Sequence, residues 1–406
     1  MLTTDVAIVG AGPAGLSAAI AAAQTGAKIT LLNEYVEPGG QLTKQIHKFF
    51  GSREHRAGVR GIDIAVQLMK EIDRLKAEKM MGTTVWSIFH TNLLAIARNG
   101  RSELLRANKI ILATGASENV VAFPGWTLPG VMGAGAAQTM VNLQRVLPGE
   151  KVLMVGAGNV GLIVAYQLLQ AGAEVVAVLD ALPRIGGYSV HSAKIARTGV
   201  PVLTSYTVKE AHGHDRVEGA TIVKVDRKWQ AIRGTEKEVE VDTICIAVGL
   251  TPLAELAWLA NCKFTWVSGL GGHVPLYDEK METTVKGIYV AGDAAGIEEA
   301  ATAMEEGRIA AVSAAESLGL MTQFRACATR AAAYTRLKNF RIGPFGKIRD
   351  QGKQFIWRAR ENYEQRFQGH RYFDRDGTPF PARCAFKGEG RERTRRGNRV
   401  RGGISL

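Results

Sequence analysis

Short apolar runs alternate with segments of helical spacing along the first 320 residues. The N-terminal region predicts a strand, an alanine-rich helix and a second strand, at Val6–Val9, Pro13–Thr25 and Lys28–Leu32. This order is that of a β-α-β unit. Apolar residues recur at helical spacing over 62–78. Residues 83–112 alternate, turn at Asn99-Gly100 and end in a strand at Lys109–Ala113, which indicates a hairpin or a small sheet.

A proline- and glycine-rich crossing at 122–132 precedes a second β-α-β unit. Its strand, helix and strand are predicted at Lys151–Val155, Val160–Gln170 and Glu174–Leu179. Later strands and a long helix are predicted at 200–208, 217–225, 241–248, Gly287–Val290 and Glu298–Leu318. Beyond residue 321 the pattern weakens, and the Arg/Gly stretch 387–404 predicts no regular element. The predicted fold class is α/β.

Each β-α-β unit carries a glycine motif between its first strand and its helix. The motifs Gly10-Ala-Gly-Pro-Ala-Gly15 and Gly156-Ala-Gly-Asn-Val-Gly161 lie 146 residues apart, and an acid stands 24 residues beyond the first glycine of each, Glu34 and Asp180. The first glycine allows a tight turn, the second lets the backbone approach a pyrophosphate, and the third lets the helix pack closely. The N–H groups of the helix N-terminus then bind the phosphates. The sequence therefore predicts two dinucleotide sites.

The residues of these motifs are the predicted cofactor contacts. In the first site they are Gly10, Gly12, Pro13, Ala14, Gly15 and, as the acceptor for the ribose hydroxyls, Glu34. In the second site they are Gly156, Gly158, Asn159, Val160, Gly161 and Asp180. A carboxylate at Asp180 would repel a 2′-phosphate, which favours NAD(H) over NADP(H), although Arg184 nearby weakens this preference. ATP offers the same ribose and stays an alternative ligand.

The cysteines exclude several kinds of redox or metal site. Cys245, Cys262, Cys327 and Cys384 form no C-x-x-C, which argues against a redox disulfide, a structural zinc or a cysteine-ligated iron–sulfur cluster, and no metal site is predicted. Unpaired cysteines are typical of a reducing cytoplasm. Neither a targeting segment nor a membrane span is expected, so the predicted location is cytoplasmic.

The basic character of the chain belongs to its C-terminal part. The net charge is +13, and residues 321–406 alone hold 21 Lys and Arg against 7 Asp and Glu, with aromatic residues interleaved. Such a segment can bind nucleic acid or dock an acidic partner. The alternative is a solvated or disordered extension. Nothing in the sequence requires this segment for the chemistry of the nucleotide sites.

Four motifs in order resemble those of the thioredoxin-reductase-like and glutathione-reductase-like flavoproteins. They are the first glycine motif, Gly39-Gly40-Gln41-Leu42, Ala113-Thr114-Gly115 and Gly287-Ile-Tyr-Val-Ala-Gly-Asp293, and the resemblance covers residues 3–320. Phe123-Pro-Gly-Trp-Thr-Leu-Pro-Gly-Val-Met132 followed by Gly135-Ala-Ala-Gln138 is most similar to the FAD-bearing A (alpha) subunits of opine oxidase, hydrogen cyanide synthase and dye-linked proline dehydrogenase.

The resemblance implies two nested Rossmann-like (βαβ) dinucleotide-binding domains, with the second inserted in the first, plus the basic C-terminal extension. The implied FAD domain comprises 1–118 and 273–320, the implied NAD(H)- or adenine-nucleotide-binding domain comprises 119–272, and the Arg-rich extension comprises 321–406. The further FAD contacts that it implies are Gly40, Gln41, Val85, Thr114, Gly115, Gly292, Asp293 and Ala301.

Asp293 would bind a ribityl or pyrophosphate-side hydroxyl of FAD, and the helix N-terminus near Ala301 would face the flavin N1/O2 edge. A helix N-cap is the alternative role for Asp293. Gln41, Gln45, His47 and Lys48 are candidates for the substrate face. Among these, His47 as a proton donor and Lys48 are the predicted catalytic residues, and a surface histidine is the alternative for His47.

The chain departs from two groups of relatives. The disulfide reductases carry a C-x-x-C beside the flavin, which this chain lacks, and several of the FAD-bearing subunits carry a cysteine-rich iron–sulfur region that Cys327 and Cys384 cannot supply. The resemblance therefore implies the FAD/nucleotide-binding subunit of a heteromeric amino- or imino-acid (opine/proline/sarcosine-like) dehydrogenase, with the substrate oxidised on a partner chain. The first alternative is a stand-alone NAD(P)H:acceptor flavin reductase. The second is a nucleotide-sensing or nucleic-acid-binding protein that uses the basic tail, although no nucleic acid is expected as a partner.

Overall fold

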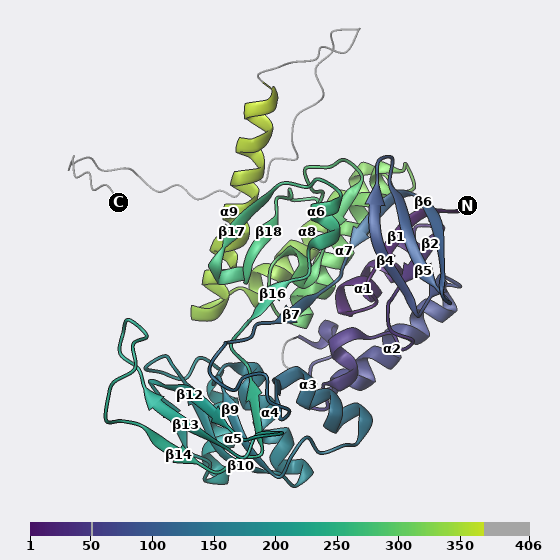
Figure 1. Cartoon of the computed structure of the whole chain (residues 1–406). Helices are drawn as coiled ribbons and strands as arrows, with labels where there is room; N and C mark the ends of the chain where they lie inside the picture. The colour runs from purple at the N-terminus through teal and green to yellow at the C-terminus, as the bar shows by residue number, and fades with distance from the viewer. Residues whose placement is uncertain (50–51, 369–406) are drawn as a thin grey trace, which may run out of the picture. The chain divides into compact units, whose positions relative to one another are not determined.

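Two mostly parallel sheets organise the computed structural model, which describes residues 1–49 and 52–368 (Figure 1). The predicted irregular stretch 387–404 lies outside these residues. The first sheet is seven-stranded, with the order β3-β2-β1-β6-β5-β4 and β19 beside β6. In chain order its strands are β1 (Leu2–Val9), β2 (Ile29–Leu32), β3 (Glu78–Met80), β4 (Thr83–Phe89), β5 (Leu93–Arg98), β6 (Arg101–Leu112) and β19 (Ile288–Val290).

Apolar side chains on the central strands of the first sheet form its core. Val6, Ile8 and Ile110 are fully buried, because helices cover the sheet. Its helices are α1 (Pro13–Ala23), α2 (Gly61–Arg74) and α7 (Ala300–Ser317). Helix α1 packs on α7 at Gly307, where an added Cβ would lie 2.1 Å from the carbonyl oxygen of Ala14. This contact brings the N-terminal half of α7 beside the first glycine motif.

The second sheet repeats the arrangement with five strands in the order β11-β10-β9-β15-β8. In chain order they are β8 (Val131–Gly133), β9 (Lys151–Val155), β10 (Glu174–Asp180), β11 (Val202–Thr204) and β15 (Thr243–Ile246). Its helices are α3 (Ala134–Thr139), α4 (Asn159–Ala171) and α5 (Ser189–Thr198). An antiparallel sheet of β12 (Tyr206–His212), β13 (Gly219–Lys224) and β14 (Lys237–Val239) packs with it.

Two chain crossings join the domains and pair with each other. Strand β7 (Ala116–Glu118) leaves the first domain and pairs antiparallel with β16 (Leu250–Pro252), which returns to it. The following elements are α6 (Glu255–Leu259), β17 (Phe264–Val267) and β18 (Gly272–Pro275). Cys262 and Leu270 pack in the core of the first domain. The chain therefore returns to the first domain before the predicted boundary at residue 272. The sequence does not show this return, because the composition does not change there.

Two helices follow where the sequence pattern weakens. They are α8 (Gln323–Phe340) and α9 (Gly343–Gln368), and Ala333, Leu337 and Ile356 pack in the core of the first domain. The expectation of a solvated or disordered extension therefore does not hold for 323–368. Buried charged residues interrupt the apolar spacing of these helices; they are Arg330, Arg341, Lys353 and Arg360.

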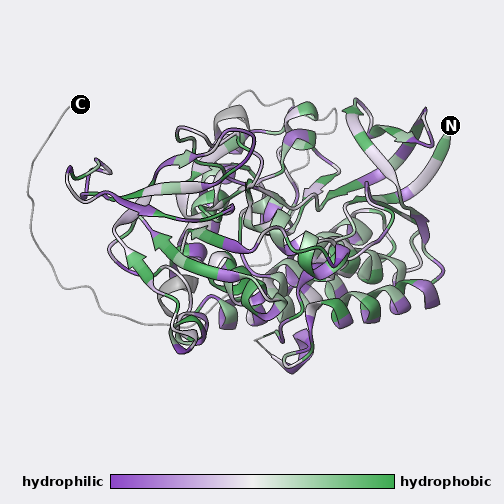
Figure 2. Cartoon of the chain, turned by 60° about the horizontal axis from the view of Figure 1, so that its bottom comes forward, coloured by the Kyte–Doolittle hydropathy of each residue, from purple (hydrophilic) through white to green (hydrophobic). Residues whose placement is uncertain are grey.

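No helix within residues 1–49 and 52–368 is both long enough and apolar enough to cross a membrane. Figure 2 shows hydrophilic residues interspersed along the helices.

Candidate functional site

The first glycine motif forms a turn in which two positions, Gly10 and Gly15, admit only glycine. Gly10 has φ +105°, and an added Cβ would lie 2.3 Å from the carbonyl oxygen of Ala113. A Cβ on Gly15 would lie 1.8 Å from the carbonyl oxygen of Gly10. In contrast, a Cβ on Gly12, the N-cap of α1, would meet no atom within 4 Å. This space lies at a helix N-terminus that begins with Pro13, so the turn fits a pyrophosphate.

The second motif reproduces the geometry of the first within a few tenths of an ångström. Gly156 has φ +111°, and its added Cβ would lie 2.2 Å from the carbonyl oxygen of Ala247. A Cβ on Gly161 would lie 1.9 Å from the carbonyl oxygen of Gly156. Gly158, the N-cap of α4, again has no atom within 4 Å of an added Cβ. Both turns thus meet the same steric condition for a dinucleotide.

The diglycine Gly39-Gly40 covers the first turn. The N–H of Gly39 donates to the carbonyl of Ala11 at 2.7 Å. A Cβ on Gly40 would lie 2.8 Å from the Cα of Gly12, so the two backbones are in contact. Gln41 follows with an exposed side chain at the start of the 3-10 helix η1 (Gly40–Lys44).

A second diglycine, Gly186-Gly187, is its counterpart in the inserted domain. The N–H of Gly187 donates to the carbonyl of Ala157 at 2.9 Å, and its added Cβ would lie 3.1 Å from the carbonyl carbon of Gly158. Asn159 fixes the next residue, because its Oδ1 accepts from the N–H of Tyr188 at 2.8 Å. The pair was not recognised from the sequence. Its signal is the spacing, since Gly39 and Gly187 stand 29 and 31 residues beyond the first glycine of their motifs.

Asp180 holds the second turn through backbone amides. Its Oδ2 accepts from the N–H of Ala157 at 3.0 Å, and its Oδ1 accepts from the N–H of Leu182 at 2.9 Å. In the first turn the equivalent amide belongs to Ala11, and it donates to Asn33 Oδ1 at 3.0 Å. The counterpart of Asp180 is therefore Asn33.

Glu34 and Asp180 have equal spacing from their motifs but do not hold equivalent positions in the two domains. The pairing of β10 with β9 shifts register between Val175 and Ala177, whereas no such shift is present between β1 and β2. The extra residue places Ala181, not Asp180, at the position of Glu34. Glu34 is exposed after β2, where it is available to a ribose. The ribose roles of both acids, and the preference for NAD(H), stay predictions.

Asp293 lies in a loop that α7 and α1 hold. Gly292 has φ +68°, and its added Cβ would lie 2.8 Å from the Cβ of Ala14. Asp293 Oδ1 accepts from the N–H of Glu298 at 3.2 Å, and burial raises the pKa of its carboxyl to about 6. The N-cap of α7 is Glu299, so the alternative role of Asp293 as the cap of this helix is wrong.

Four predicted FAD contacts occupy different surroundings. The hydroxyl of Thr114 donates to the carbonyl of Leu253, and the N–H of Leu253 donates to the carbonyl of Gly115 at 2.9 Å, so Thr114 and Gly115 fasten the chain crossing. Val85 is partly buried in β4. Ala301 is buried in the first turn of α7. Their contacts with FAD stay predictions.

His47 lies where the two domains meet. The imidazoles of His47 and His191 stand edge to face with their centroids 6.3 Å apart, whereas Lys48 is exposed. Burial, followed by the charges of His191 and Lys194, lowers the pKa of His47 to about 4. A neutral imidazole at pH 7 is a poorer acid, so this pKa disfavours the predicted role as a proton donor.

The segment after the diglycine also contacts helix α3. Lys44 Nζ donates to the carbonyl of Gly135 at 3.3 Å and to Thr139 Oγ1 at 3.2 Å. The amides of Gln45 and Gln138 lie within 3.5 Å of each other. The structure therefore brings together two of the motifs that carry the family resemblance, the diglycine segment and Gly135–Gln138.

Cys245 and Cys262 are buried, and burial raises the pKa of the Cys245 thiol to about 12. Among residues 1–49 and 52–368, no three His, Cys, Asp or Glu side chains gather as a metal site. Cys384 lies outside these residues.

Comparison with known families identifies the fold that carries these turns. The family model described as pyridine nucleotide-disulphide oxidoreductase matches residues 4–307. The chain belongs to this family. Its flavoproteins use FAD and NAD(P)H, which confirms the prediction of an FAD-dependent oxidoreductase at the level of the family. The contacts of individual residues with the cofactors stay predictions.

Several relatives are named as subunits of larger enzymes. The A subunit of opine oxidase from Rhizobium meliloti is 31% identical over 345 residues, which cover 78% of this chain and 64% of the relative. The alpha subunit of sarcosine oxidase from Corynebacterium sp. (strain P-1) is 27% identical, covering 78% of this chain and 33% of the relative. The HcnB subunit of hydrogen cyanide synthase from Pseudomonas aeruginosa is 26% identical, covering 83% and 76%. The chain thus spans less than two thirds of the first of these relatives.

Two solved structures share the fold. T. acidophilum thioredoxin reductase superposes with a TM-score of 0.64 at 24% identity, covering 78% of this chain and 100% of that one. L-proline dehydrogenase from P. horikoshii superposes with a TM-score of 0.62 at 22% identity, covering 82% and 59%. These matches confirm the predicted α/β class with two Rossmann-like domains.

Proposed function

We propose that the chain is the FAD- and nucleotide-binding subunit of a heteromeric dehydrogenase that oxidises an amino or imino acid on a partner chain. The observation that carries the proposal is the pair of complete glycine turns in a chain without a C-x-x-C. Two such turns suit FAD and a nucleotide, while the sequence offers no redox disulfide to which electrons could pass. The three relatives described above are named as subunits, which supports a partner chain.

Bound FAD would supply hydride transfer at the flavin, and the residues of the first turn would hold it. Gly12 would let the pyrophosphate approach the N–H groups of α1, and Glu34 would bind the ribose. Asp293 would bind a hydroxyl on the ribityl side. The N-terminal turn of α7, with Ala301, would stabilise negative charge at the flavin N1/O2 edge.

The second turn would hold NAD(H), or another adenine nucleotide, in the same way. Gly158 would leave space for the phosphates. The Gly186-Gly187 segment would lie along the nucleotide as Gly39-Gly40 would lie along FAD. Tyr188, the next residue, donates from its hydroxyl to Glu299 Oε1 at 3.0 Å. Because Glu299 caps α7, this bond joins the second nucleotide loop to the helix that would face the flavin.

Two of the cations in the described part of the extension do not support the nucleic-acid-binding alternative. Arg341 and Lys353 are 7% and 1% exposed and pair with buried carboxylates, so they are not available to a phosphate backbone. The cations beyond residue 368 lie outside the described residues.

Turnover of the purified chain tests the proposal. We expect the chain alone to oxidise neither amino nor imino acids such as proline, sarcosine or an opine, and to reduce dyes slowly with NADH. Co-purification with a partner chain should restore amino-acid-dependent dye reduction. Rapid NADH-driven dye reduction by the chain alone would contradict the subunit role and favour a stand-alone NAD(P)H:acceptor reductase.

A further inference from the structure

Two buried glutamates hold the loop of Asp293, Glu306 through its carboxylate and Glu298 through its backbone N–H. Glu306 Oε2 accepts from the N–H of Gly292 at 3.1 Å, at the start of the 3-10 turn η5 (Gly292–Ala295). Glu298 donates its backbone N–H to Asp293 Oδ1. The side chains of both glutamates are 3% exposed. Because ionised carboxylates are costly to bury, each needs a partner.

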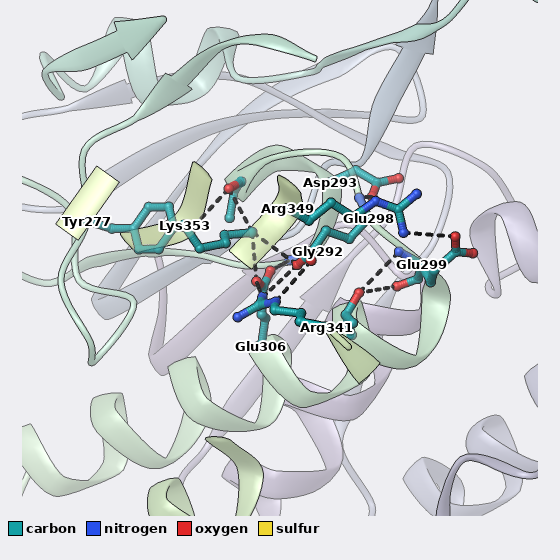
Figure 3. Close-up of polar contacts among 11 residues, drawn as sticks. Tyr277, Gly292, Asp293, Glu298, Glu299, Glu306, Arg341, Arg349 and Lys353 are labelled. Carbon is teal, nitrogen blue, oxygen red and sulfur yellow. Dashed lines mark hydrogen bonds and ion pairs between the residues drawn. The ribbon is translucent and has the colours of Figure 1, made fainter. Parts of the chain in front are cut away.

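Arg341, at the end of α8, is one partner and spans both acids (Figure 3). Its Nε and Nη2 donate to the two carboxylate oxygens of Glu298 at 3.0 and 2.6 Å. The same Nη2 donates to Glu306 Oε1 at 2.9 Å. A bidentate contact of this kind fixes the orientation of a carboxylate and favours its ionised form.

Lys353, on α9, is the other partner. Its Nζ lies 2.7 Å from Glu306 Oε1 and donates to the carbonyl of Ala295 at 3.0 Å, with Glu298 Oε2 at 3.6 Å. The hydroxyl of Tyr277 donates to the same carbonyl at 3.0 Å, and Figure 3 shows Lys353 between the tyrosine and the acids. Lys353 is 1% exposed, so these contacts replace the water that would otherwise hydrate its ammonium group.

The turn η5 is therefore fastened at both ends by buried side chains. Its first N–H is bound by Glu306, which Arg341 and Lys353 hold, and its last carbonyl is bound by Lys353 directly. The two cations neutralise the two acids. The match to the family model ends at residue 307, and the helices that supply both cations follow that residue.

We propose that Arg341 and Lys353 of the C-terminal helices are positioning residues of the FAD site. They act through Glu298 and Glu306 to set the place of Gly292, Asp293 and the first turn of α7. The inference rests on the proposed binding of FAD at the first glycine turn. It assigns to 323–368 a role that the sequence alone does not suggest.

Two measurable properties follow. A displaced η5 would present Asp293 poorly to FAD, which lowers affinity. Loss of one cation would also leave net negative charge behind the loop, and this charge disfavours the anionic reduced flavin, so the midpoint potential of bound FAD becomes more negative.

The test compares Lys353→Met with Lys338→Met, because Lys338 is an exposed cation on α8. The FAD dissociation constant is measured by flavin fluorescence after reconstitution, and the midpoint potential by spectroelectrochemistry. We expect Lys353→Met to weaken FAD binding about tenfold or more and to lower the potential. Lys338→Met should change neither property.

A charge-balanced variant keeps the test informative if Lys353→Met folds poorly. Lys353→Met combined with Glu306→Gln removes one cation and one anion. This double variant should recover the potential of the wild type but not its full FAD affinity, because the bonds to η5 are still missing. Wild-type affinity and potential in both the single and the double variant would overturn the proposal.

A measurement without FAD separates this inference from the proposed function. In the apoprotein, hydrogen exchange of residues 292–302 should be faster in Lys353→Met than in the wild type and in Lys338→Met. A wild-type chain that binds no FAD would refute the proposed function, while the exchange rates would still report on positioning. Unchanged exchange in Lys353→Met would refute the positioning role.

Discussion

Asp180 and Asn33 occupy the same place in the two glycine turns, each accepting at 3.0 Å from the amide of the alanine that follows the first glycine. An acid and its neutral isostere thus perform one structural task. The carboxylate of Asp180 therefore needs no ribose to explain its presence, and the amide acceptor is the property that the turn requires.

Asp180→Asn should leave nucleotide binding nearly intact, because an amide oxygen can still accept from Ala157. Asp180→Ala removes the acceptor of two backbone amides, and we expect it to cost about 1–3 kcal/mol of unfolding free energy and to weaken nucleotide binding. Urea denaturation and titration with NADH and NADPH measure both effects. A tenfold or larger gain of NADPH affinity in Asp180→Asn would instead show that this carboxylate selects against the 2′-phosphate.

Gly12→Ala and Gly158→Ala form a matched pair. Both residues have an extended backbone that alanine adopts, and an added Cβ meets no protein atom within 4 Å. The methyl group should therefore be tolerated by the fold but occupy the space of a pyrophosphate. We expect Gly12→Ala to lose FAD while keeping nucleotide binding, and Gly158→Ala to do the reverse. Equilibrium dialysis of each ligand checks this, and equal losses in both variants would contradict two independent sites.

Gly307→Ala should disturb the FAD side more than its small size suggests. Its Cβ would lie 2.1 Å from the backbone carbonyl of Ala14, so α7 must move away from α1. We expect a loss of about 1–3 kcal/mol in unfolding free energy and weaker FAD binding. Gly186→Ala, whose Cβ meets nothing within 4 Å, is the control for stability. Equal unfolding midpoints in the two variants would contradict the close crossing of these helices.

His47 should make the apoprotein less stable as the pH falls. Its pKa is about 4 in the folded state, below the ordinary imidazole value of 6.5, so the unfolded chain takes up the proton first. The stability associated with the neutral imidazole is complete above about pH 6.5 and is lost between there and about pH 4. Allowing for its partial exposure, we expect wild type to lose about 1 kcal/mol relative to His47→Gln between pH 7.5 and 5. Urea denaturation at both pH values measures the difference, and parallel stabilities would show that His47 is not held neutral.

The glycine turns were predictable because their cause is local. Gly10 and Gly15 need the absence of a side chain, and that need is visible in the sequence as a motif between a strand and a helix. The roles of Asn33 and Asp180 were not predictable by spacing, because the register shift in β10 is a property of strand pairing. The second diglycine, Gly186-Gly187, is followed by Tyr188 and not by the Gln-Leu pair that completes the first motif.

The packing of the C-terminal helices α8 and α9 could not be predicted from the sequence, and the reason is electrostatic. Arginine and lysine are typical of a solvated surface. Arg341 and Lys353 are buried because they pair with acids far away in the sequence, one just before α7 and one on it. The predicted boundary at residue 272 departs from the structure for a similar reason. Cys262 and Leu270 are apolar residues that could belong to the core of either domain, and only their packing assigns them to the first.

The visible spectrum of the purified chain, before and after anaerobic NADH, tests the central claim most directly. Two nucleotide sites in one flavoprotein chain predict a yellow protein with the absorption bands of oxidised flavin, which bleach when NADH is added and return with air. A colourless protein that takes up no FAD on reconstitution would contradict the account.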